Sequence, residues 1–547
     1  MLERRKAGSL ALALLPMAMA VAWRFSLPDD LDSNDQAKQA LYVLDIFERG
    51  NWILPREQGV LPATKPPLYA WLAALASAPA GGPTETACRV PSMLASLALA
   101  WLIWHLGSRR WSNAAGVAAA WIFATTHTVL KLCIHVRPDM VLTVLTTTAL
   151  LALLWREGER PRANAPLFWL ATSLSILAKG PPGPVLIGGG LLLLSFSREE
   201  RGRVKRLLTS PWMALLGLPL LWFVLALREG GEAYLTGTVL GELSKRAPGT
   251  FGSDDNLPGT LFVHFVVRAA PWSLLALIAS ARLASRKTAP EVRRDLLPFA
   301  AWFIPALAFF SVLRGQREDY LLPLLPPAAL LVARALSDPT AALERRVWDA
   351  VAVLFAPAAL LLGALAFLAV WPSARNGPPV ARYLWGGSLI AAALLTAWGW
   401  RRDRSGGASR LTAGFFLRTL ALLVVSLTFH ATPSPQARSG KGRDLEEFVS
   451  RVGRERREGD EISFFGDVTN GVRFSTRVNA PSLPPEGVAA LDPGPPSGGR
   501  RLLITDAPGE EALNAFKPGR FQVYFHHPHG KENPDLVLGE WLPGPGG

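Results

Sequence analysis

The carboxylates best placed to do chemistry are Asp35, Asp139 and Glu242, which stand in polar segments between long apolar stretches of this 547-residue chain. A carboxylate can serve as a general base. The polar segments alternate with a second, arginine-rich set at residues 4–6, 109–110, 156–162, 198–206, 282–294, 334–346 and 401–410. Cytoplasmic loops carry excess Lys and Arg, so the arginine-rich set is predicted inside and the three acids outside. This arrangement suggests an enzyme that works at the outer surface of a membrane.

The composition indicates a polytopic α-helical membrane protein. Half of the residues are hydrophobic, and the formal charge of +14 lies mainly in short loops, where it orients the chain and gives no sign of a nucleic-acid partner. A span needs about 20 apolar residues, which predicts thirteen spans with an inside N-terminus and an outside C-terminus. They lie near 10–25, 88–106, 114–130, 140–155, 166–177, 184–196, 212–227, 260–280, 296–313, 320–335, 347–371, 383–400 and 411–430.

The last part of the chain differs in composition from the rest. After His430 comes a Pro/Ser/Gly linker, and strand-like runs at 462–465, 501–505 and 521–525 alternate with helical spacing at 445–452 and 510–516. We therefore divide the chain into a membrane domain, 1–436, and a small C-terminal α/β domain, 437–547, on the outer side. Residues 481–499 are predicted to form a loop.

Two outer loops of the membrane domain are large, 28–87 and 228–259, and the first is far longer than a connector needs. Its first half, from Asp35 to about residue 49, has one apolar and one charged helical face, which predicts an amphipathic helix along the membrane surface. A second helix ends near residue 79. A large ordered loop usually carries function. The structural alternatives are that Asp35 caps the helix and that Lys65 is an interfacial anchor.

Several motifs resemble the group of integral-membrane glycosyltransferases that contains the aminoarabinose transferases and the protein O-mannosyltransferases. The motifs occupy residues 35–38, 50–55, 65–69, 89–92, 137–140, 177–181, 309–311 and 320–327. The resemblance implies the GT-C fold, and the thirteen spans with a C-terminal periplasmic domain look like the aminoarabinose-transferase branch. It also implies transfer of a sugar from a polyprenyl-phosphate carrier to an acceptor outside the membrane.

The resemblance carries roles for four residues. Asp35 and Asp139 match the family's two acidic positions and are the expected catalytic residues, whereas Lys38 and Lys65 match its phosphate-contacting cations. Asp35 would be a general base toward a hydroxyl acceptor, or would orient the sugar if the acceptor is already an anionic lipid phosphate. The structural alternative for Asp139 is a charge that stabilises a helix N-terminus. Lys38 stands where many relatives have arginine, so bidentate phosphate contact is lost.

Further candidates lie in later outer segments. Glu242 and Arg246, one helical turn apart, resemble an acidic-and-arginine motif of the family, or form a surface pair four residues apart. Arg317 and Tyr320, with the nearby Arg314, are expected to contact the carrier phosphate, unless they only anchor the chain at the interface. 

No metal or other cofactor is expected. Relatives that hold zinc use a glutamate just before the Lys-Pro-Pro motif and a histidine in the second large loop, but Thr64 and Leu243 stand at those positions. Cys88 and Cys133, near outer span ends, could form a disulfide or pack as small apolar residues.

The expected function is therefore that of a glycosyltransferase in the bacterial plasma membrane, with a polyprenyl-phosphate sugar as donor and a lipid A-like glycolipid or another glycan as acceptor. The alternatives are a protein O-mannosyltransferase-like enzyme and a transporter of lipid-linked sugars. Transporters place ionisable residues near the bilayer midplane and contain repeated halves. In this chain the mid-span regions are nearly free of acids and show no convincing repeat, which favours the enzyme. 

Overall fold

The structure is a computed structural model, and two units can be recognised in it. It describes residues 2–26, 31, 34–154, 164–241, 259–312, 317–368, 379–405, 411–431, 441–484, 487–488, 499–515, 520–527 and 535–542. Unit 1 comprises Met1–Leu27, Pro91–Leu225 and Val239–Thr432, and unit 2 comprises Pro28–Val90, Ala226–Thr238 and Pro433–Gly547. Unit 2 therefore combines the first predicted outer loop with the C-terminal segment.

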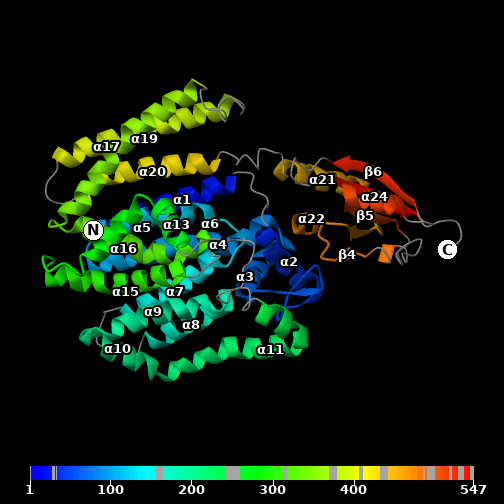
Figure 1. Cartoon of the computed structure of the whole chain (residues 1–547), viewed down its shortest axis with the longest axis horizontal. Helices are drawn as coiled ribbons and strands as arrows, with labels where there is room; N and C mark the ends of the chain where they lie inside the picture. The colour runs from blue at the N-terminus through cyan, green and yellow to red at the C-terminus, as the bar shows by residue number, and fades with distance from the viewer. Residues whose placement is uncertain are drawn as a thin grey trace. The chain divides into compact units, whose positions relative to one another are not determined.

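Unit 1 is helical (Figure 1). Its helices, of which α4 begins in unit 2, α11 ends there and η3 lies mostly there, are α1 (Leu2–Ser26), α4 (Glu85–Arg110), α5 (Asn113–Ala124), α6 (His127–Leu132), α7 (Asp139–Leu154), α8 (Ala165–Lys179), α9 (Pro182–Ser195), α10 (Arg198–Leu208), η2 (Pro211–Leu216), α11 (Gly217–Ala233), η3 (Tyr234–Leu240), α13 (Thr260–Arg268), α14 (Trp272–Ala281), α15 (Pro290–Val312), η4 (Glu318–Leu324), α16 (Leu325–Ser337), α17 (Ala342–Phe367), α19 (Pro379–Ser405) and α20 (Ala413–Ala431).

Five helices of the described chain are long and apolar enough to cross a membrane, or six if one bent pair counts as a span. They are Ala7–Ser26, Glu85–Arg110, Pro211–Leu240, Glu318–Ser337 and Ala342–Ala366, with the pair Thr260–Arg268 and Trp272–Ala281. Shorter apolar helices include α5, α7, α8, α9 and most of α20. The helical membrane fold expected from the sequence is thus present, while the count of thirteen spans stays a prediction.

Two of the predicted spans are not continuous helices. The segment 114–130 is broken between α5 and α6, where the hydroxyls of Thr125 and Thr126 donate back to the carbonyl of Ile122 at 3.1 and 3.0 Å. The segment 260–280 bends by 112° between α13 and α14, at Pro271, which has no backbone N–H to continue a helix. Both segments were predicted as spans from their apolar content. The breaks in the helices were not predicted, because such local interruptions of the backbone leave the apolar content of a segment unchanged.

Close packing in unit 1 depends on small residues, as between α4 and α5. A side chain at Gly116 would have its Cβ 2.5 Å from the carbonyl oxygen of Trp104 and 2.1 Å from the hydroxyl of Ser108. Only glycine permits this approach of the two backbones, which is a common arrangement where helices pack in membranes. Ser112 caps α5 by accepting a hydrogen bond from the N–H of Ala115 at 3.2 Å.

Unit 2 begins with the segment predicted as the first outer loop. Its elements are α2 (Asn34–Arg49), the antiparallel pair β1 (Arg56–Glu57) and β2 (Leu61–Pro62), α3 (Leu68–Ser77) and η1 (Ala78–Ala80). The helix predicted from Asp35 is confirmed. Its polar side is not solvated as in a surface helix, because Gln36, Gln39 and Asp45 are exposed by 2% or less. It packs against α3 and against α22 (Asn470–Ser475) of the C-terminal segment.

The C-terminal segment is an α/β fold, as predicted. Its other elements are α21 (Lys441–Glu455), β3 (Glu461–Phe465), β4 (Ser482–Leu483), β5 (Arg501–Asp506), α24 (Ala507–Ala515), β6 (Arg520–His527) and β7 (Leu536–Leu542). The sheet has the order β4-β3-β5-β7-β6, in which β3 is parallel to β4 and β5 while β7 is antiparallel to β5 and β6. The three predicted strands and both helices are present, whereas β4, β7 and the short helix α22 were not predicted.

Both faces of this sheet are covered. Leu502 and Ile504 of β5 pack into a cluster with Phe448 of α21, whereas Leu503 packs on the opposite face with Trp541 of β7. Alternate residues of a strand point to opposite faces. The central strand is therefore apolar throughout, and this pattern made it predictable.

Candidate functional site

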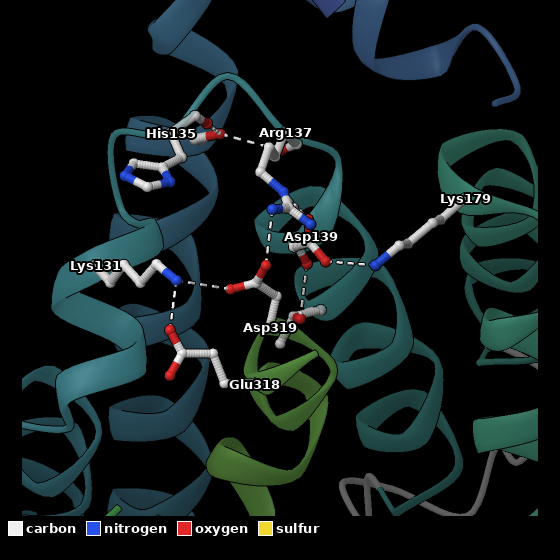
Figure 2. Close-up of polar contacts among 9 residues, drawn as sticks. Lys131, His135, Arg137, Asp139, Lys179, Glu318 and Asp319 are labelled. Carbon is white, nitrogen blue, oxygen red and sulfur yellow. Dashed lines mark hydrogen bonds and ion pairs between the residues drawn. The ribbon is translucent and has the colours of Figure 1, made fainter. Parts of the chain in front are cut away.

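Unit 1 contains a cluster of seven charged side chains, six of which are labelled in Figure 2. The cluster consists of Lys131, Arg137, Asp139, Lys179, Arg268, Glu318 and Asp319. Helices α7 and α8 pack together, with Asp139 in the first turn of α7 and Lys179 in the last turn of α8. The helix dipole favours an acid at the first position and a cation at the second.

Positive and negative groups alternate through the cluster. Asp139, which is 3% exposed, accepts from Nε of Arg137 at 3.0 Å and from the ammonium group of Lys179. Nη1 of Arg137 lies 2.7 Å from Asp319. A buried carboxylate costs several kcal/mol unless it is paired. The pairing shown in Figure 2 therefore explains how these charges are tolerated among apolar helices.

Two further cations complete the cluster on its other side. Lys131 pairs with Glu318 and lies 3.4 Å from Asp319. Nε of Arg268 lies 2.9 Å from Glu318. The seven groups thus comprise four cations and three carboxylates, a formal charge of +1. A positive surplus among partly desolvated groups suits an anion such as a phosphate.

Tyr320 joins the cluster through a cation–π contact. The ammonium nitrogen of Lys179 lies 4.4 Å from the centroid of the Tyr320 ring, within the range where such contacts are attractive. The Phe310 ring packs 5.7 Å from the same tyrosine. Asp139 and Tyr320, two site residues predicted from distant segments, are thereby brought to the same cation.

The loop between α6 and α7 is held by α4. The hydroxyl of Ser92 donates to the carbonyl oxygen of His135 at 2.5 Å and to that of Arg137 at 3.3 Å. Ser92 belongs to one of the motifs on which the family resemblance rests, and this contact gives it a structural role. It fixes the backbone from which the Arg137 guanidinium reaches both acids.

Three predicted residues lie in unit 2. Asp35 is half-buried in the first turn of α2, and Lys65 is half-buried in the turn before α3. Lys38 places Nζ 2.9 Å from Oε2 of Glu57. Burial alone would lower the pKa of Lys38, but Tyr42 and Glu57 outweigh it, so the pKa lies above its ordinary value. The N–H of Thr64 donates to the Tyr42 hydroxyl at 3.3 Å, which brings the turn that carries Lys65 onto α2.

The remaining predictions have mixed outcomes. Glu242, Arg246 and Arg314 lie outside the described residues, and Arg317 is exposed just before η4. Cys88 and Cys133 are buried and are not joined by a disulfide, so that alternative is wrong. Within the described ranges, no group of three His, Cys, Asp or Glu side chains is arranged to hold a metal ion.

Sequence reasoning missed six members of the charged cluster as site residues, although two of them stand in the quoted motifs. A signal was available. Ionisable residues in apolar helices are costly and are usually functional, and Asp319 is the neighbour of Tyr320 just as Arg137 is close to Asp139. Examination of the residues next to each predicted site residue would have identified both Asp319 and Arg137.

Comparisons with known proteins show what the chain is similar to. Residues 64–227 match the sequence profile of a family described as dolichyl-phosphate-mannose-protein mannosyltransferase. The undecaprenyl phosphate-alpha-4-amino-4-deoxy-L-arabinose arabinosyl transferase 2 of Proteus mirabilis (strain HI4320) is 24% identical over 60% of this chain and 60% of its own length. The corresponding transferase of Pectobacterium carotovorum is 27% identical over 58% of this chain and 57% of its own length. The matches thus span less than two thirds of these relatives.

The fold comparison extends further along the chain. The crystal structure of ArnT from Cupriavidus metallidurans bound to undecaprenyl phosphate superimposes with a TM-score of 0.70 and 17% identity, covering 96% of this chain and 97% of that one. The apo state of the same protein gives a TM-score of 0.69. Motifs, profile and fold therefore agree with one another, and the resemblance inferred from the sequence is confirmed. The chain is similar in sequence to the aminoarabinose transferases and has the fold of ArnT, a GT-C membrane fold.

Proposed function

We propose that this protein is a membrane glycosyltransferase that moves a monosaccharide from a polyprenyl-phosphate carrier to an acceptor of the cell envelope. Two comparisons support the donor class: the relatives are named as undecaprenyl phosphate-aminoarabinose transferases, and the ArnT structure is described as bound to undecaprenyl phosphate. A lipid-linked donor also explains why such an enzyme would be embedded in a membrane.

The observation that carries the proposal is the cationic cluster beside Tyr320. Transfer of the sugar leaves a lipid phosphate whose negative charge grows as the glycosidic bond breaks, and fixed cations stabilise that charge. Lys179 and Arg137 are held by Asp139, so they are oriented before a substrate binds. Preorganised groups of this kind need no rearrangement during the reaction.

We assign roles on this basis. Asp139 belongs to the catalytic site as the anion that orients two cations, because both of its oxygens already accept from them. Asp35, half-buried on α2, is the candidate general base or sugar-orienting group. Beside Lys179 and Arg137, the proposed phosphate-binding residues are Lys38, Lys65 and Tyr320, together with Arg246 and Arg317, and Glu242 remains an acidic candidate. No metal takes part in the proposed reaction.

The proposed location is the bacterial plasma membrane, crossed thirteen times, with the site and residues 437–547 on the periplasmic side. The support is the alternation of arginine-rich segments with segments that carry the candidate acids. The proposed acceptor is a lipid A-like glycolipid or another envelope glycan. A protein hydroxyl is the second candidate, because the mannosyltransferase profile matches residues 64–227.

The test uses purified full-length protein in lipid with undecaprenyl-phosphate sugars as donors. Acceptors are offered separately as lipid A-type glycolipids, other envelope glycans and unfolded envelope proteins, and products are identified by mass spectrometry. Release of undecaprenyl phosphate together with a glycosylated acceptor is the expected result, and the acceptor that gains mass distinguishes the two candidates. Movement of the donor between leaflets of proteoliposomes without any transfer would instead establish the transporter alternative.

A further inference from the structure

The C-terminal segment contacts the first loop of unit 2 through two buried asparagines. The first, Asn470, starts helix α22 and is 5% exposed. Its Nδ2 donates to Oδ1 of Asn34 at 2.8 Å and to Oε1 of Glu57 at 2.7 Å, and its Oδ1 accepts from Nε2 of Gln58 at 3.1 Å. Both N–H groups and the oxygen of the amide are thus used. This amide is fitted to the loop and cannot be replaced by an apolar group without loss.

Glu57 transmits this contact to a predicted phosphate-binding residue. The carboxylate is 5% exposed, and its two oxygens have different partners. Oε1 accepts from Asn470, and Oε2 lies 2.9 Å from Nζ of Lys38. The two oxygens belong to one planar carboxyl group, so a hydrogen bond that holds Oε1 restricts the rotation of the group and helps to keep Oε2 facing the Lys38 ammonium group.

The second asparagine, Asn479, is 1% exposed and binds the other side of the β1–β2 hairpin. Its Nδ2 donates to the carbonyl of Arg56 at 3.0 Å and to Oδ1 of Asp45 at 3.3 Å, and its Oδ1 accepts from the N–H of Gly59 at 3.1 Å. Its backbone carbonyl accepts from Arg49 at 2.9 Å. The fully buried Asp45 also accepts from the N–H of Arg56 at 2.8 Å.

The hairpin needs this support because its turn is conformationally unfavourable. Gln58 has φ of 54° and Gly59 has φ of 71°. A non-glycine residue in this left-handed region is strained and persists only when its surroundings hold it. The side chain of Gln58 and the N–H of Gly59 are the groups that the two asparagines bind.

The C-terminal fold in turn presents the asparagines rigidly. Arg473 of α22, 2% exposed, donates to the carbonyl of Ala480 and to the Ser482 hydroxyl, the latter at 2.8 Å. Its guanidinium lies 4.4 Å from the centroid of the Phe464 ring in β3. These contacts tie the segment around Asn479 to the sheet.

We propose that the C-terminal segment positions the donor-binding loop, with Asn470 acting through Glu57 on Lys38 and with Asn479 holding the hairpin in register. Both asparagines are positioning residues. The inference rests on the proposed function, in which Lys38 contacts the carrier phosphate. It gives the C-terminal segment a part in donor binding.

A double-mutant cycle tests the relay. In Asn470→Ala, the KM for the lipid-phosphate sugar is expected to rise about tenfold while kcat changes little, corresponding to one lost buried hydrogen-bond set. In a Lys38→Ala background the same substitution should have almost no further effect, because the residue through which it acts is gone. Equal effects in both backgrounds would show a general loss of structure and would overturn the relay.

Two controls keep the outcome interpretable. Gln522→Ala removes an exposed amide from β6 of the same segment and should leave both constants unchanged. If Asn470→Ala does not accumulate in the membrane, Asn470→Ser, which keeps a shorter polar side chain, replaces it in the same double-mutant cycle. If the parent protein is active and a well-folded Asn470 variant has the same KM for the donor, the result contradicts the inference.

Hydrogen exchange provides a reading that does not depend on turnover. The peptide covering residues 34–62 should exchange about tenfold faster in Asn470→Ala and Asn479→Ala than in the unmodified full-length protein, and at the same rate in Gln522→Ala. Unchanged exchange in both asparagine variants overturns the inference even if the protein shows no transferase activity. If exchange is faster in the asparagine variants as expected, but the parent protein transfers no sugar, the result contradicts the proposed function alone.

Discussion

The ammonium group of Lys179 lies 4.4 Å from the centroid of the Tyr320 ring. Lys179 is the last residue of α8, and Tyr320 stands in η4, about 140 positions later. The ring shields one side of the cation from water, and Asp139 neutralises another. A cation held in this way keeps its place and retains the capacity to attract an anion.

Removal of this cation should strongly impair transfer. We expect Lys179→Ala to lower kcat/KM for a polyprenyl-phosphate sugar by about 100-fold or more, as for other preorganised charge-stabilising groups. Lys287→Ala, which removes an exposed lysine between α14 and α15, is the matched control and should behave like the parent protein. The measurement is initial rate at varied donor concentration. Parent-like kinetics of Lys179→Ala would exclude the cluster from the active site.

Two residues of unit 2 give a second kinetic prediction. Asp35→Asn and Lys65→Ala should each reduce transfer by about 100-fold while the protein accumulates normally, because both side chains are only half-buried and little core packing is lost. A fall in kcat for Asp35→Asn indicates a general base, and a rise in donor KM indicates sugar orientation. Asp467→Asn, an exposed carboxylate of the same unit, is the control. Retained activity in both variants would refute the assignment by family resemblance.

A stability prediction concerns a buried pair in unit 1. Arg418 of α20 and Asp403 of α19 are 3% and 5% exposed and form an ion pair, and Arg418 also lies 3.3 Å from Asp349. Arg418→Met leaves the Asp403 carboxylate buried without its main partner, which typically costs about 3–5 kcal/mol. Thermal unfolding in detergent should show a clear fall in Tm, whereas Arg401→Met at an exposed site of α19 should not. Equal Tm values for the two variants would mean that the pair is not structurally important.

The sidedness of the protein can be tested with engineered cysteines. Both native cysteines are buried, so background labelling is low. Gln522→Cys and Lys287→Cys introduce thiols at exposed positions of the C-terminal sheet and of an arginine-rich segment. In right-side-out vesicles, a membrane-impermeant maleimide should label only Gln522→Cys, and both should react after detergent is added. Labelling of both cysteines in sealed vesicles would contradict the predicted orientation.

A pH prediction follows from Asp460, which precedes β3. Burial would raise the pKa of Asp460, but hydrogen bonds from Arg500 and from the N–H of Arg457 lower it below its ordinary value. The unfolded carboxyl has a pKa of about 3.9. The stability contributed by Asp460 is therefore present above that pH and is lost as the pH falls through the lower folded value.

The variant Asp460→Asn should therefore show its full defect above about pH 4 and lose that defect as the pH falls through the lower folded pKa. At pH 7, hydrogen exchange in β3 and β5 is expected to be about tenfold faster than in the parent protein, the effect of a hydrogen bond to a charged group. The two proteins should converge at lower pH, after correction for intrinsic exchange rates. Asp467→Asn serves again as the exposed control. A difference that does not shrink as the pH is lowered would assign the effect to something other than the charge of Asp460.

The sequence alone determined the features that depend on local pattern. Apolar runs identified the helical membrane fold, and strand-like runs at 462–465, 501–505 and 521–525 identified β3, β5 and β6. Local motifs selected Asp139 and Tyr320, which the structure connects through Lys179. Such features are visible in a sequence because periodicity and residue type are properties of neighbouring positions.

Only the tertiary structure decided which charges meet. Pairing of Arg137 with Asp319, or of Asn470 with Glu57, joins residues separated by 182 and 413 positions. No local pattern encodes these pairs, because each residue taken alone is an ordinary polar side chain. They form because burial removes water from charged and amide groups, which must then find partners wherever the packed helices and strands bring them.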